Sequence, residues 1–130
     1  MVKALDNQLE EGIRLATNPD EPIDQRKELA VWLKGPNDTL YGGLWGWTYF
    51  GWLYVDALWV HEGLRGTDFG TQLITIAETE AKKRGCHSAR LETLSFQARP
   101  FYEKLGYQLF GEIPNHPAPH TMYFLSKRLE

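Results

Sequence analysis

The chain lacks several features that would point to common functional classes. Cys86 is the only cysteine among 130 residues, so no disulfide can form within the chain, as suits a reducing cytoplasm. No apolar stretch approaches the roughly 20 residues that cross a bilayer, and no signal segment opens the sequence. The net charge is −3, whereas nucleic-acid binders usually carry a basic surplus. We therefore expect a cytoplasmic protein without a membrane or nucleic-acid partner.

Motifs for common phosphate and metal ligands are also missing. Neither GxGxxG nor GxxxxGK[ST] occurs, which disfavours a Rossmann dinucleotide site and a P-loop. His116 and His120 lie in a proline-rich loop without cysteines or clustered acids. That pattern does not predict a metal site.

What is present is an alternation of strand and helix patterns that fits one domain over residues 1–130. We expect helices at 6–17, 69–84 and 97–105, and strands at 28–34, 40–50, 52–60, 89–94, 107–113 and 122–129. The unit at 52–94 should place two parallel strands around a right-handed helical crossover. The predicted fold class is α/β, with a mixed sheet whose parallel strand–helix–strand core is flanked by antiparallel strands and by helices.

Three local patterns refine these elements. The glycines at 42, 43 and 46 suggest a bulge or a close backbone approach within the hairpin. The strand at 52–60 is nearly all apolar, which predicts that both of its faces are covered. The helix at 69–84 has an apolar stripe, and on its other face we expect the pairs Glu78–Lys82 and Glu80–Arg84.

The turn between the strand at 52–60 and the following helix is rich in glycine. Unpaired amide hydrogens and the helix dipole make the start of a helix favourable for an anion. Arg65 can add a charge-assisted hydrogen bond. Spacing alone leaves two interpretations open, an anion site and a connection without a ligand.

Here the residues resemble a known family. The segment Arg65-Gly66-Thr67-Asp68-Phe69-Gly70 is similar to the Arg/Gln-x-x-Gly-x-Gly/Ala motif of the GNAT acetyltransferases, except that Asp68 replaces a glycine. The later segment LETLSFQARPFYEKLGY, with Tyr102, also resembles that family. Asp68 places a carboxylate beside the expected pyrophosphate, although Asp tolerates left-handed backbone and can cap a helix start.

The resemblance implies a GNAT-like sheet and direct transfer of an acetyl group from acetyl-CoA to a primary amine of a small molecule or peptide. It implies a thioester bound where the strand at 52–60 separates from the strand at 89–94. The cofactor-binding residues that it implies are Leu58, Val60, Leu64, Arg65, Gly66, Thr67, Asp68, Phe69, Gly70, Thr71 and Tyr102.

Three residues are candidates for catalysis. Tyr102 matches the family tyrosine that protonates the departing thiolate, and the alternative is that it only packs the short helix onto the sheet. Asp56 interrupts an apolar strand, where a buried carboxylate needs partners. Asp56 and Glu92 are each a candidate base for the amine and, equally, a candidate structural hydrogen-bond acceptor.

Two other functions remain open. One is a non-catalytic acyl-CoA sensor on the same fold, motivated by Asp68 and the unassigned base. The other is an interaction module that uses the aromatic hairpin with Trp45, Trp47, Tyr49 and Trp52. That hairpin suits core packing, a homodimer interface or a wall that binds the amine.

Overall fold

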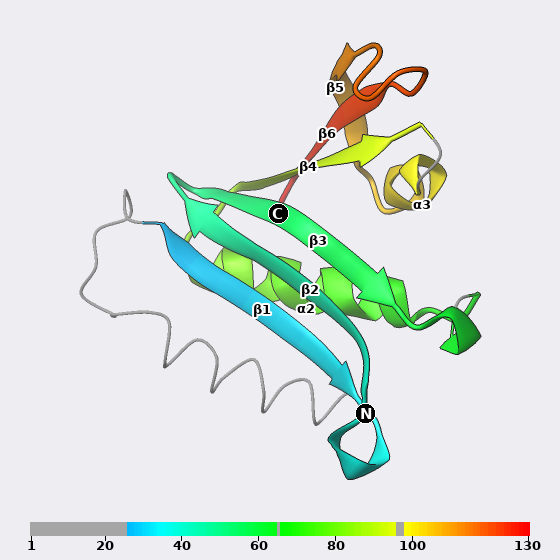
Figure 1. Ribbon diagram of the computed structural model, residues 1–130. Helices are drawn as coiled ribbons and strands as arrows, with labels where there is room; N and C mark the ends of the chain where they lie inside the picture. The colour runs from blue at the N-terminus through cyan, green and yellow to red at the C-terminus, as the bar shows by residue number, and fades with distance from the viewer. Residues whose placement is uncertain (1–25, 65, 96–97) are drawn as a thin grey trace.

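The computed structural model describes residues 26–64, 66–95 and 98–130, which form a six-stranded mixed sheet with helices beside it (Figure 1). The strand order is β1-β2-β3-β4-β6-β5, in which β3 and β4 are parallel and every other neighbouring pair is antiparallel. This confirms the predicted mixed sheet around a parallel core. The predicted helix at 6–17 lies outside the described residues.

The elements agree closely with the predicted ranges. The strands are β1 (Lys27–Lys34), β2 (Leu40–Tyr49), β3 (Trp52–Val60), β4 (Ser88–Leu94), β5 (Gln108–Ile113) and β6 (Met122–Arg128). The α-helices are α2 (Phe69–Lys83) and α3 (Arg99–Lys104), and two 3-10 turns are η1 (Pro36–Asp38) and η2 (Glu62–Leu64). Within the described residues, no helix is long and apolar enough to cross a membrane.

Helix α2 covers one face of the strands β1 to β3 (Figure 1). Because successive strand residues point to opposite faces, every second residue of β1 is buried under this helix. The core contains Leu29, Val31, Leu33, Leu44, Leu53, Leu73, Ile74, Ala77 and Ala81, each at most 1% exposed. These side chains hold α2 against the sheet by removing apolar surface from water.

One of the two predicted charge pairs on α2 is present, and the other is not. Arg84 does pair with Glu80, at 3.2 Å, and its guanidinium also donates to the backbone carbonyls of Lys27 and Glu28. Glu78 does not pair with Lys82. It is buried, and it accepts hydrogen bonds from the Tyr107 hydroxyl at 2.8 Å and from Lys127 Nζ at 2.9 Å. Its side chain lies on the covered side of α2, where it connects the helix to β6 and to the start of β5.

The expectation that both faces of β3 are covered is wrong. Its first half alternates buried and half-buried residues, but Asp56, Ala57 and Trp59 are exposed. The apolar residues of β3 thus include aromatic side chains on an uncovered face. This face lies on the side of the sheet opposite α2 and carries Trp59 as well as Trp45, which is 37% exposed.

The glycine-rich hairpin contains the predicted bulge and close approach. The pairing of β2 with β3 shifts between Trp45 and Gly46, because Trp45 faces Ala57 whereas Gly46 faces Val55. Asp56 is the extra residue on β3. A side chain at Gly46 would collide with the carbonyl oxygen of Tyr54, so this position requires glycine.

Candidate active site

The parallel strands β3 and β4 separate directly after the bulge. Their register runs from Trp52–Ser88 to Val55–Leu91, and beyond Val55 the described part of β3 pairs with β2 only. A cavity of about 720 Å³ opens at this point, lined by residues 55–58 of β3, residues 91–93 of β4, and Ala98 and Tyr102. The pocket therefore lies between β3 and β4 beside the bulge, where the family resemblance implied that the two strands separate.

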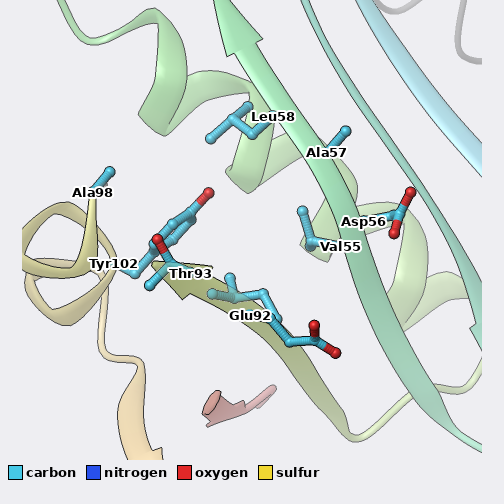
Figure 2. A pocket seen from close by; sticks show the side chains of 9 residues that line it. Val55, Asp56, Ala57, Leu58, Glu92, Thr93, Ala98 and Tyr102 are labelled. Carbon is cyan, nitrogen blue, oxygen red and sulfur yellow. The ribbon is translucent and has the colours of Figure 1, made fainter. Parts of the chain in front are cut away.

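The side chains around this cavity point in two directions (Figure 2). Tyr102 directs its hydroxyl into the space near Leu58 and Val55, with Thr93 beside it. The carboxylates of Asp56 and Glu92 point away from Tyr102. All three predicted catalytic residues therefore line one cavity, with the phenol on one side and the carboxylates on the other.

Tyr102 is held in place by packing. It is 8% exposed, and its ring makes edge contacts with Phe101 at 5.1 Å and with Tyr107 at 5.9 Å between centroids. Burial raises the pKa of Tyr102 to about 12, so the phenol keeps its proton at neutral pH. The structure gives its hydroxyl no hydrogen bond to a described residue, which leaves the proton available to a molecule in the cavity.

The two carboxylates differ in their surroundings. Asp56 is exposed at the bulge, so the expectation that it is buried with partners is wrong. Glu92 is also exposed, but its Oε1 accepts a hydrogen bond of 3.2 Å from the Tyr54 hydroxyl. Tyr54 was missed by the sequence reasoning, because the contact depends on the register of β3 beside β4.

A second cavity, of about 300 Å³, lies where β3 meets the turn before α2. Its lining includes six of the predicted cofactor-binding residues, namely Leu58, Val60, Leu64, Gly66, Thr67 and Gly70. Leu58 and Ala98 line both cavities, so the two spaces adjoin. Gly66 has a φ of 86° and no atom within 4 Å of the position of a Cβ, which leaves its backbone open to a ligand.

The other predicted cofactor-binding residues of the turn lie differently. Arg65 is outside the described residues. Phe69 is half-buried against the core, and neither Phe69 nor Thr71 lines the second cavity. The Thr67 hydroxyl donates to the carbonyl of Leu64, so this side chain stabilises the turn itself.

Asp68 precedes the first residue of α2 but does not cap the helix with its side chain. Its Oδ1 accepts a hydrogen bond of 3.0 Å from Gln72 Nε2, one turn along the helix. Asp68 is exposed and does not line the second cavity. The carboxylate that departs from the family motif is therefore engaged by α2 and lies outside the cavity lining.

Three other residues that could carry chemistry, two histidines and the cysteine, have mainly structural contacts. The Nδ1 of His61 accepts a hydrogen bond of 3.0 Å from the backbone N–H of Gly63 and so supports the turn. Cys86 is buried, and burial raises the pKa of its thiol, which keeps it protonated and poorly nucleophilic. His120 lies 3.3 Å from Ser95 Oγ through its Nδ1, within the 114–121 loop.

Known proteins resemble this chain in sequence and in fold. The model of the Acetyltransferase (GNAT) family matches residues 4–107. Blasticidin-S acetyltransferase of Streptomyces morookaense is 39% identical over 112 residues, covering 83% of this chain and 82% of the relative. The crystal structure of an acetyltransferase from Bacillus cereus superposes with a TM-score of 0.79 at 34% identity, covering 98% of this chain and 90% of the other.

A further solved structure, an aminoglycoside 6'-N-acetyltransferase complexed with coenzyme A, shares the fold with a TM-score of 0.71 at 21% identity, covering 98% of this chain and 92% of the other. The sequence relatives named above are acetyltransferases, and they cover most of the chain. The residues that the family model matches include both the turn before α2 and the Tyr102 segment, and these two segments help to line the adjoining cavities. The chain therefore belongs to the GNAT family of acetyltransferases and is an acyltransferase.

Proposed function

We propose that this enzyme transfers the acetyl group of acetyl-CoA to a primary amine of a small molecule or peptide. The observation that carries the proposal is the pair of adjoining cavities that joins the start of α2 to the space between β3 and β4. One end suits a pyrophosphate. The other has a protonated phenol and two carboxylates whose side chains point away from it, and a thioester and an amine would meet there.

The residues at the turn fit coenzyme A. The backbone of Gly66 is open, Gly70 has no side chain, and the first amides of α2 have no partners within the helix. Leu58 lines both cavities and Val60 lines the one at the turn, and at Leu58 the described part of β3 pairs with β2 only. Pantetheine carries amides that suit such a strand edge, and it would extend from the turn to Tyr102.

The chemistry follows from the two sides of the cavity. A carboxylate takes one proton from the acceptor ammonium, because only the neutral amine is nucleophilic. The nitrogen forms a C–N bond with the thioester carbonyl, the C–S bond breaks, and Tyr102 gives its proton to the sulfur. The second nitrogen proton restores the phenol through water. The net reaction consumes acetyl-CoA and an ammonium and yields an amide, a thiol and one proton.

Similarity to blasticidin-S acetyltransferase supports a small-molecule acceptor, because the match covers most of both chains. The exposed carboxylates of Asp56 and Glu92 also suit a cationic amine more than an anionic substrate. Blasticidin S is therefore the first acceptor to test, followed by other small amines and short peptides.

The test is release of coenzyme A thiol from acetyl-CoA with and without each amine. We expect release that depends on the amine, together with a new amide in the product. Tyr102→Phe should lower kcat by about 100-fold or more while the KM for acetyl-CoA changes little, since the hydroxyl acts on the leaving sulfur. The matched control is Tyr41→Phe, which removes a hydroxyl from β2 at a residue that lines neither cavity.

Two results would contradict the proposal. Binding of coenzyme A without turnover of any amine would instead support the acyl-CoA sensor. Equal kcat for Tyr102→Phe and the parent enzyme would remove the acid role and leave Tyr102 as a packing residue.

A further inference from the structure

Two carboxylates line the cavity, and the proposed reaction needs only one of them as the base. Asp56 is the extra residue of the β3 bulge, is exposed, and has no hydrogen bond to a described residue in the structure. Glu92 lies on regular β4 backbone paired with Phe124 of β6. The strand holds the backbone of Glu92, and a second contact fixes its carboxylate.

That contact comes from Tyr54, whose hydroxyl donates to Glu92 Oε1 at 3.2 Å. Tyr54 pairs with Arg90 in the register, one residue before the last pair that joins β3 to β4. Its hydroxyl therefore reaches across the two strands at the point where they separate. The bond leaves Glu92 Oε2 without a hydrogen bond to any described residue, so this oxygen can accept a proton.

The ring of Tyr54 is itself held by two neighbours. Trp47 of β2 packs against it with 4.6 Å between centroids and 35° between planes. The guanidinium of Arg90 lies 4.3 Å from the Tyr54 centroid, a cation–π contact. These contacts restrict the side-chain torsions of Tyr54, so the hydroxyl is a fixed donor and not a mobile one.

Tyr54 also keeps its proton over the working range of the enzyme. Burial, followed by the nearby Glu92 carboxylate, raises the pKa of Tyr54 to about 12. The hydrogen bond to Glu92 therefore persists from neutral to moderately alkaline pH.

We propose that Glu92 is the base that deprotonates the acceptor amine, and that Tyr54 is a positioning residue that holds the Glu92 carboxylate at the mouth of the cavity. This inference rests on the proposed acetyl transfer. Glu92 Oε2 takes a proton from the ammonium, the N–H bond breaks, and the freed electron pair attacks the thioester carbonyl. The proton on Glu92 then passes to water, which returns the carboxylate for the next turnover.

The test is a double-mutant cycle on kcat and on the KM for the amine. Glu92→Gln should lower kcat by about 100-fold, since a positioned base contributes on this order. Tyr54→Phe keeps the ring and loses the hydroxyl, and we expect a loss of about tenfold in kcat because the base is less well oriented. In the Glu92→Gln background, Tyr54→Phe should have no further effect, because the residue acts through Glu92.

Asp56→Asn tests the competing carboxylate. It should lower kcat much less than Glu92→Gln does, and its effect on kcat should multiply with that of Tyr54→Phe, since the two residues then act independently. The matched control is Tyr41→Phe, which removes a hydroxyl from the neighbouring strand β2 at a residue that lines neither cavity, and it should leave kcat unchanged. Thermal unfolding of each variant separates loss of function from loss of fold.

The outcomes distinguish this inference from the proposed function. Full activity of Glu92→Gln, with activity lost in Tyr102→Phe, would overturn Glu92 as the base and leave acetyl transfer intact. A further loss of kcat when Tyr54→Phe is added to Glu92→Gln would overturn the positioning role. Absence of amine-dependent thiol release in the parent enzyme would refute the proposed function itself.

Discussion

At the scale of single residues, Gly70 is where the start of α2 meets the second cavity. It is the second residue of the helix, and a Cβ built on it would lie 3.2 Å from Cζ of Phe101. An aspartate here would add bulk against that ring and negative charge at the end of the helix that favours anions. We expect Gly70→Asp to weaken coenzyme A binding by more than about tenfold, measured by titration calorimetry.

Gly70→Asn is the matched control for this change, because it adds almost the same volume without the charge. A smaller loss of affinity in Gly70→Asn than in Gly70→Asp would show that charge at the helix start matters. Unchanged affinity in both variants would remove the pyrophosphate from this turn.

Among single residues, the catalytic candidates could be predicted from the sequence, but the side of the cavity on which each one lies could not. Tyr102, Asp56 and Glu92 were predicted together, and one cavity contains all three. Tyr54 could not be found, because nothing local in the sequence says that its hydroxyl reaches a residue 38 positions away. The exposed position of Asp56 was also hidden, since an acid in an apolar strand looks the same whether the strand is covered or bulged.

At the scale of elements, the strand and helix ranges were predictable because their signals are local. Apolar spacing, the glycines at 85 and 106, and the turn at 35–38 define the ends of the elements. Register and helix rotation were not predictable in the same way. Glu78 illustrates the limit, because its spacing to Lys82 suits a surface pair, yet it points under the helix to Tyr107 and Lys127.

The Glu78 network, formed by the hydrogen bonds that Glu78 accepts from Tyr107 and Lys127, links α2 to β6 and to the start of β5. Tyr107 is 2% exposed, and its hydroxyl donates to Glu78 Oε2 at 2.8 Å. Tyr107→Phe would leave that buried carboxylate oxygen without this donor, which costs about 1–3 kcal/mol. We expect the free energy of unfolding in urea to fall by this amount, with Tyr49→Phe changing it by less than about 0.5 kcal/mol as the exposed control. Equal losses in the two variants would contradict a stabilising network.

At the scale of the whole molecule, the buried phenols link the fold to pH. Burial raises the pKa of Tyr54 and Tyr102 from 10.0 to about 12. Burial, followed by the Glu78 carboxylate, raises the pKa of Tyr107 further still. The folded chain therefore keeps protons that the unfolded chain releases above pH 10 or so. The stability associated with these groups is fully present below that pH and is lost as the pH rises through their folded values.

We therefore expect the urea midpoint of unfolding to fall steeply between about pH 10 and 12, because the unfolded state loses phenolic protons first. For Tyr102 the shift of two units sets an upper bound of about 2.7 kcal/mol. Lysine deprotonation also contributes to any alkaline loss, so the informative comparison is with Tyr102→Phe, which lacks one of the shifted phenols and should show a shallower decline. Parallel curves for the two proteins would mean that Tyr102 titrates alike in the folded and unfolded chains. Such a phenol would not be shielded from water, and its hydroxyl would be open to solvent as well as to a molecule in the cavity.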